Sequence, residues 1–185
     1  MANLEHDATP AAKPELDLQQ FLPYRLNSLA DRLSQALARL YAERYDLNIA
    51  QWRVLAWLSH LDELTAKQIC QATRMDKARI SRAVQSLEDR GLILRRPSSR
   101  DQRVHDLRLT PAGQALLSKL IPEAQQWEAE LVATLSGGEY RDLMNVMGKL
   151  ERQLERLEKT HDDWSQDRSG DPMETPGTAE LDGDR

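Results

Sequence analysis

The sequence is poor in aromatic residues and in cysteine. Aromatic side chains make up 5% of its 185 residues, and there is one cysteine, Cys70. A single cysteine excludes an internal disulfide framework and is typical of a protein of the reducing cytoplasm, where we expect this one to reside. Because 40% of the residues are hydrophobic, we expect a core made mainly of aliphatic side chains.

Long apolar segments are also lacking. No run of about eighteen apolar residues occurs, so we expect no membrane-spanning helix. Residues 1–14 contain no apolar stretch of the kind found in signal peptides. No phosphate-binding loop, nucleophile elbow or dinucleotide fingerprint is present, and the four histidines are too far apart for metal-ligand spacing. We therefore expect neither an enzyme nor a cofactor or metal site.

The net charge of −5 is unevenly distributed along the chain. Residues 74–108 contain ten Lys or Arg and five Asp or Glu, a local charge of +5, which leaves −10 for the remaining residues. Eight acids and two bases give −6 to residues 161–185. A basic segment in an acidic chain favours binding to a polyanion such as DNA, although an ordinary solvated surface could carry the same charge.

Helix-start signals recur along the chain. Asn48, Thr65 and Ser136 are each followed three residues later by Gln or Glu, which is the capping-box pattern. Thr110 precedes a proline suited to a first helical turn, and two short apolar runs flank the polar residues 97–103 as in a β-hairpin. We predict helices at about 23–45, 48–58, 65–73, 76–90, 111–135 and 136–159, with hairpin strands at 92–94 and 104–109.

This order of elements predicts a mainly α-helical protein with a small β-hairpin wing, that is, a winged helix-turn-helix on a helical dimerisation platform. The polar chain ends have too few apolar residues to fold. We divide the chain into a disordered N-terminal arm (1–17), a helical dimerisation region (18–47 and 111–160), a winged helix-turn-helix DNA-binding domain (48–110) and a disordered acidic tail (165–185).

The predicted helix at 76–90 would present its polar side to DNA. Its apolar residues Ile80, Ala83, Val84 and Leu87 share one face, and arginine and glutamine on the other can read guanine and adenine edges. The hairpin tip carries arginines that suit a narrow minor groove, with Asp101 orienting Arg103. An ordinary exposed helix face and a solvated turn are the alternatives. The predicted DNA-binding residues are Lys77, Ala78, Arg79, Ser81, Arg82, Gln85, Arg100, Asp101 and Arg103.

The last predicted helix carries an apolar row with spacings of three and four residues. A narrow row of this kind at the end of a chain requires a partner to cover it, so we predict a homodimer. The alternative is that the three long helices pack on one another within a monomer. The row consists of Tyr140, Leu143, Met147, Leu150, Leu154 and Leu157.

Several segments resemble the MarR family of transcriptional regulators. Residues 75–84 and 87–93 resemble that family's recognition helix and its exit, and Asp101–Arg103 with residues 107–113 resemble its wing. The resemblance covers roughly residues 20–158. It implies a homodimer that binds a pseudo-palindromic site in double-stranded DNA, in most members as a repressor. It also implies release by a small molecule, often a phenolic or aromatic acid.

We predict an effector site where the first helix meets the second and fifth. Tryptophan rings beside an arginine suit a small aromatic acid or its coenzyme A thioester, with Arg25 as the first candidate for the carboxylate. The alternative is that both tryptophans belong to the core and both arginines pair with surface acids. The candidate residues are Tyr24, Arg25, Asn27, Ser28, Trp52, Arg53 and Trp57.

Two other functions remain open at this point. One is a helical protein-interaction adaptor, which would bind a protein rather than DNA. The other is a redox-responsive regulator that uses Cys70. The resemblance implies a sensing cysteine near the start of the first helix for peroxide-responsive members, and this chain has none there.

Overall fold

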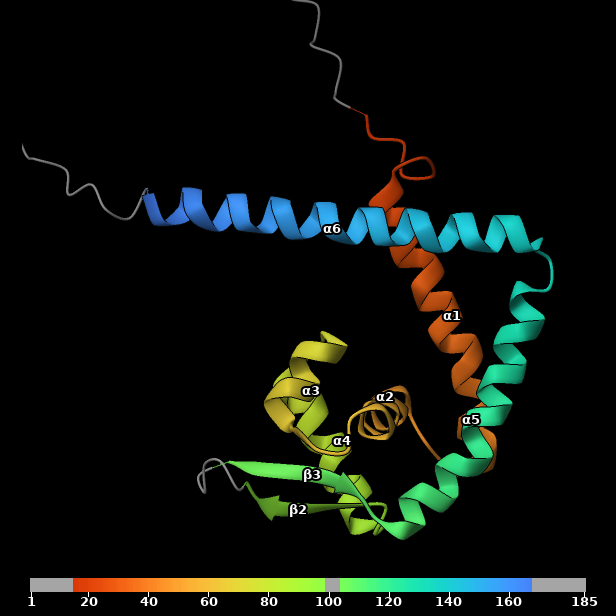
Figure 1. The fold of residues 1–185 in the computed structure, drawn as a ribbon, viewed down its shortest axis with the longest axis vertical. Helices are drawn as coiled ribbons and strands as arrows, with labels where there is room; N and C mark the ends of the chain where they lie inside the picture. Colours follow the sequence, from red (N-terminus) through yellow and green to blue (C-terminus); the bar gives the residue numbers. More distant parts are fainter. Residues whose placement is uncertain (1–14, 99–103, 168–185) are drawn as a thin grey trace, which may run out of the picture. The chain divides into compact units, whose positions relative to one another are not determined.

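The computed structural model describes residues 15–98 and 104–167, with side chains up to Thr160. The chain forms two compact units, residues 1–129 and 130–185. The elements are α1 (Leu22–Tyr45), α2 (Ile49–His60), β1 (Leu64–Thr65), α3 (Ala66–Thr73), α4 (Lys77–Asp89), β2 (Ile93–Pro97), β3 (His105–Leu109), α5 (Pro111–Val132) and α6 (Gly137–Asp167). The predicted mainly helical winged fold is confirmed (Figure 1).

The helices of the first unit begin where their capping residues predict. Asn48 and Thr65 each accept a hydrogen bond from the backbone three residues on, and the glutamine there reaches back to complete the capping box. Asp76 accepts from the backbone N–H of Arg79 at 2.7 Å and starts α4. The helix ends at a turn in which Gly91 has φ +68°, a conformation that glycine adopts without strain.

The sheet has three antiparallel strands in the order β1-β3-β2. The predicted hairpin pairs Ile93 with Leu109 at its root and Pro97 with His105 toward its tip. Strand β1, which the sequence analysis does not predict, pairs Leu64 with Leu107 on the outer edge of β3. The sheet thereby ties the hairpin to the segment that leads into α3.

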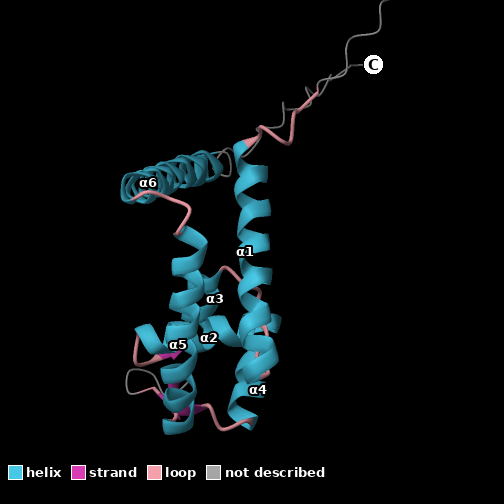
Figure 2. Cartoon of the chain, turned by 90° about the vertical axis from the view of Figure 1, so that its right-hand side faces the viewer, coloured by secondary structure: helices cyan, strands magenta, loops and turns pink. Residues whose placement is uncertain are grey.

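The core of the first unit lies where α2, α3 and α4 meet the sheet. Val54, Leu55, Ile69, Ile80 and Leu87 have essentially no exposed surface. In Figure 1, α2 and α3 lie on the same side of the hairpin, and α2 also packs against α1, which Figure 2 shows from the side. Burial of these aliphatic side chains fixes the inner face of α4 and leaves its polar face outside.

The second unit contains the end of α5 and the long helix α6. Ser136 and Glu139 form the predicted capping box at its start, and the hydrogen bonds from Ser136 lower the pKa of Glu139. The helix continues to Asp167, eight residues beyond the predicted end at 159, because no glycine or proline interrupts that stretch. Residues 165–167, assigned to the tail, are therefore helical. Nearly all of the predicted arm and tail lies outside the described residues.

No helix among the described residues is both long and apolar enough to cross a membrane.

Candidate DNA-binding interface

Helix α4 exposes the whole predicted contact face. Its four predicted inward residues are buried, each at most 5% exposed. The residues predicted to touch DNA on this helix are all exposed: Lys77, Ala78, Arg79, Ser81, Arg82 and Gln85.

The three cations of this face have no acidic partner in the described part of the chain. Lys77, Arg79 and Arg82 form no ion pair there. The acids of α4 lie in its last turn instead, where Gln85 donates from Nε2 to Asp89 at 2.8 Å. The first two turns of α4 therefore present three cations that no ion pair among the described residues neutralises.

Side-chain hydrogen bonds of Gln51 and Arg90 connect α4 and its C-terminal end to α2 and α1. The buried side chain of Gln51, part of the α2 capping box, donates from Nε2 to the Ser86 hydroxyl at 2.8 Å. Just after α4, the Arg90 guanidinium donates to the carbonyl oxygens of Tyr45 and Asp46 at 2.8 and 2.6 Å. These carbonyls lie at the end of α1, so Arg90 links the exit of α4 directly to α1. No local sequence pattern predicts this role, because the contact joins residues 44 and 45 positions apart.

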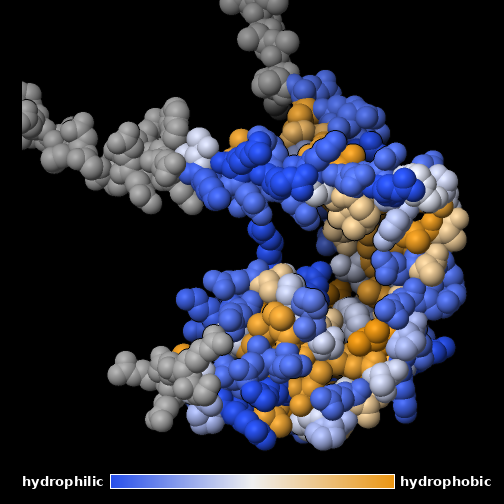
Figure 3. Space-filling model, viewed as in Figure 1, coloured by the Kyte–Doolittle hydropathy of each residue, from blue (hydrophilic) through white to orange (hydrophobic). Residues whose placement is uncertain are grey.

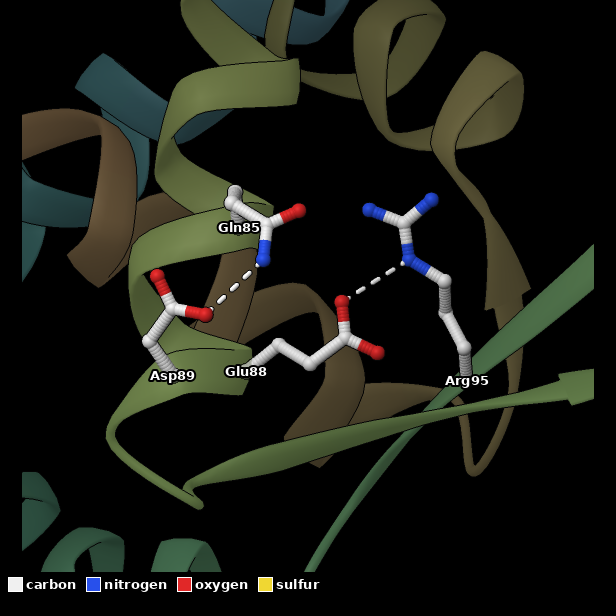
Figure 4. Close-up of polar contacts among 4 residues, drawn as sticks. All are labelled: Gln85, Glu88, Asp89 and Arg95. Atoms are coloured by element: carbon white, nitrogen blue, oxygen red, sulfur yellow. Dashed lines mark hydrogen bonds and ion pairs between the residues drawn. The ribbon is translucent and has the colours of Figure 1, made fainter.

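The root of the wing carries an arginine that the sequence analysis missed. Arg95 on β2 donates from Nε to Glu88 of α4 at 3.0 Å (Figure 4). In this view the two terminal nitrogens of the Arg95 guanidinium lie level with the carboxamide of Gln85. On β3, Arg108 pairs with Glu63, which joins the hairpin to the segment before β1. The wing-tip candidates Arg100, Asp101 and Arg103 lie outside the described residues.

A cleft of about 610 Å³ lies between α3 and the wing. Its lining includes Lys67 and Gln68 near the start of α3, and Arg95 and His105 from the two hairpin strands. The acids Glu63 and Asp106 also line it, so this cleft is less basic than the face of α4.

The candidate effector residues fall into two groups. Tyr24, Arg25, Asn27 and Ser28 are exposed on the first turns of α1. Trp52 stacks on the buried Tyr41 with ring centroids 5.5 Å apart, and Arg53 donates to Ser34 at 3.3 Å. Burial raises the pKa of Tyr41 to about 12, against the opposing charge of Arg53.

Neither group lines the cleft between α3 and the wing. Arg25 lies nine residues before Ser34, or about 14 Å along the helix axis at 1.5 Å per residue. Trp57, the other candidate aromatic, contacts His60 edge to face at 6.1 Å. A second cleft of about 440 Å³ lies between the end of α2 and the first half of α5, and none of the seven candidates lines it.

Comparisons with known proteins agree with this geometry. Residues 45–104 match the family model described as MarR family. A MarR family transcriptional regulator from Silicibacter pomeroyi DSS is 30% identical, with a TM-score of 0.65, and the match covers 74% of this chain and 90% of that one. The uncharacterized HTH-type transcriptional regulator YdgJ of Bacillus subtilis is 27% identical over 105 residues, 57% of this chain and 64% of that protein.

A more distant solved structure shares the fold. BpsR of Bordetella bronchiseptica, whose DNA binding is regulated by 6-hydroxynicotinic acid, is 23% identical with a TM-score of 0.58, and the match covers 69% of this chain and 98% of that one. The family-model match over residues 45–104 includes α4 and strand β2. The chain belongs to the MarR family of DNA-binding transcriptional regulators.

Proposed function

We propose that the protein binds a pseudo-palindromic DNA site as a homodimer and reads its sequence with α4 in the major groove. The observation that carries this proposal is the exposed face of α4, with three cations and a glutamine on a helix fixed by its buried opposite face. An α-helix fits the major groove, where arginine and glutamine form the most discriminating base contacts.

The wing would lie along the adjacent minor groove. Strands β2 and β3 form a two-stranded ribbon whose tip sequence carries Arg100 and Arg103. A guanidinium is attracted into a narrow minor groove by its strong negative potential. We infer that Arg103 enters that groove and that Asp101 orients it.

Dimer formation would bring two α4 helices to one side of the molecule. The predicted apolar row of α6 is largely uncovered in the single chain, with Leu154 and Leu157 each 57% exposed. Leucines in the first turns of α1 are also exposed, including Leu22 and Leu26. The face of α6 seen in Figure 3 is mostly hydrophilic, as expected if the apolar residues occupy a separate stripe.

Selection from a random duplex pool, followed by fluorescence anisotropy titrations, tests this function. The full-length protein should select an inverted repeat, with half-sites about one helical turn apart. Its affinity should fall steeply between low and moderate salt, because phosphate contacts release counterions. Failure to enrich any sequence, together with salt-independent binding, would exclude the proposal and favour a protein-interaction adaptor.

An aromatic acid is the effector class that we propose. The aromatic pair Tyr41 and Trp52 lies beside Arg53, which favours Arg53 over the distant Arg25 as the carboxylate partner. The regulation of BpsR by 6-hydroxynicotinic acid is a precedent for this ligand class on the same fold. An effector that prefers a different placement of the α4 helices would release the DNA and relieve repression.

Calorimetry with benzoates, hydroxycinnamates and their coenzyme A thioesters tests the effector site. Arg53→Ala should weaken binding of the acid that the parent binds, on the order of tenfold or more for a charge-assisted pair. Arg25→Ala should retain parent affinity if Arg53 is the partner, and the reverse result would restore Arg25 as the first candidate. No heat from any compound would remove aromatic acids from consideration.

A redox role for Cys70 is less well supported. Cys70 is partly buried against the core of the first unit, where a small apolar residue is expected. We therefore keep small-molecule release as the proposed form of regulation.

A further inference from the structure

The last turn of α4 contains an arrangement that bears on which base the helix reads, if the proposed DNA binding is correct. Gln85 lies on the exposed face of the helix, and its carboxamide has one donor end and one acceptor end. Which end faces the DNA decides which base can bind it. Neighbours that fix the orientation of this carboxamide would therefore influence specificity.

Asp89 fixes the orientation of this carboxamide. The Gln85 Nε2 lies 2.8 Å from Asp89 Oδ1. Because an ionised carboxylate can only accept hydrogen bonds, the nitrogen rather than the oxygen of Gln85 must face it.

Arg95 favours the same orientation from the other side. Glu88 holds the guanidinium by its Nε at 3.0 Å, and in Figure 4 the amide oxygen of Gln85 points toward the side where the terminal nitrogens of Arg95 lie. A negative charge beside the nitrogen and a positive charge near the oxygen both oppose a flip of the amide. Within the described residues, the oxygen accepts no hydrogen bond and remains available.

We propose that Asp89 is a specificity-determining positioning residue, which makes Gln85 prefer a base with an exocyclic amino group. In the major groove adenine offers N6–H₂ and cytosine N4–H₂, whereas guanine offers only the acceptors O6 and N7 and thymine the acceptor O4. An outward amide oxygen accepts from adenine or cytosine, whereas guanine and thymine offer it no donor. Gln85 is thus expected to face adenine or cytosine in each half-site.

The test is selection from a random duplex pool with the full-length protein and four variants. Gln85→Ala should lose base preference at one symmetry-related position, which locates the contact. The parent should select adenine or cytosine there.

Asp89→Asn should relax that preference at least about fivefold, since an asparagine can either accept or donate. Asp89→Lys should reverse it toward guanine or thymine, because an ammonium requires the amide oxygen to turn inward.

The matched control is Glu128→Gln, which removes an exposed carboxylate from α5 and alters neither Asp89 nor the ion pair between Glu88 and Arg95. It should keep the parent's base at that position. Parent-like selection by both Asp89 variants, or no affected position in Gln85→Ala, would overturn the inference and leave the proposed DNA binding intact. A parent that enriches no sequence would instead overturn the proposed function and this inference with it.

Discussion

Arg82 shows how a single side chain depends on the opposite face of its helix. It is exposed, it has no ion-pair partner in the described part of the chain, and it is followed directly by the buried Ala83 and Val84. Because its Cα belongs to a turn anchored in the core, the backbone from which this side chain extends is held in place. Fixed placement lowers the entropy cost of forming a bidentate contact with a base.

Arg82→Ala should therefore weaken binding to the selected site by about 1–3 kcal/mol while lowering affinity for unrelated DNA much less. Anisotropy titrations of both duplexes measure the two affinities. Lys119→Ala removes an exposed cation from α5 and serves as the control for loss of charge. Equal losses on both duplexes would show that Arg82 contacts phosphate rather than a base.

Sequence patterns predict residues whose role depends on their own helix, and they miss those that depend on distant contacts. The exposed face of α4 follows from helical periodicity alone. Arg90 was missed because its two partners lie 44 and 45 residues earlier in the chain. Arg95 was missed because its partner lies seven residues earlier on a different element, and no local pattern places the two side chains together. The predicted wing-tip contacts at Arg100 and Arg103 remain predictions.

At the scale of elements, the junction between the hairpin and α5 depends on one glycine. Gly113 lies in the first turn of α5, where a Cβ would overlap the carbonyl oxygen of Leu92 and crowd Leu109. That carbonyl accepts a hydrogen bond from the N–H of Thr110 at 3.0 Å, so it cannot move freely. The first turn of α5 can approach the start of the wing this closely only without a side chain.

Gly113→Ala should lower the free energy of unfolding by roughly 1–3 kcal/mol, the range for overpacking a filled site. The gain in helix propensity from alanine is smaller, at about 1 kcal/mol. Urea denaturation followed by circular dichroism measures the change. Gly137→Ala is the matched control, since a Cβ added there would meet nothing within 4 Å. An unchanged or increased stability of Gly113→Ala would contradict the close packing.

Elements with local start and stop signals were predicted well. The capping residues located the starts of α2, α3, α4 and α6, and the alternation of short apolar runs located the hairpin. Strand β1 was missed because two residues are too few to show a period, and its pairing with β3 spans over forty residues. The end of α6 was misplaced because the chain beyond 159 stays polar without a stop signal.

At the scale of the whole molecule, association would cover apolar surface that the single chain leaves open. Tyr140, Leu143 and Met147 of α6 are 39–45% exposed, and the row continues to Leu157. An apolar row of this length is stabilised when a second helix packs into it, by about 25 cal/mol for each Å² removed from water. The homodimer would satisfy this requirement and supply the two-fold symmetry of a pseudo-palindromic site.

Replacing Leu143 and Leu150 by aspartate should abolish the dimer, since both substitutions place a charge within the apolar row. Sedimentation equilibrium measures the mass, and circular dichroism reports whether α6 remains helical. Asn145→Asp with Arg152→Asp introduces two acids on the same helix but away from the row, and this control should remain dimeric. Affinity for the selected inverted repeat should fall with the dimer, because each half-site would then be bound separately and the benefit of linkage lost. A folded dimer of unchanged mass in the Leu143 and Leu150 variant would show that another surface joins the protomers.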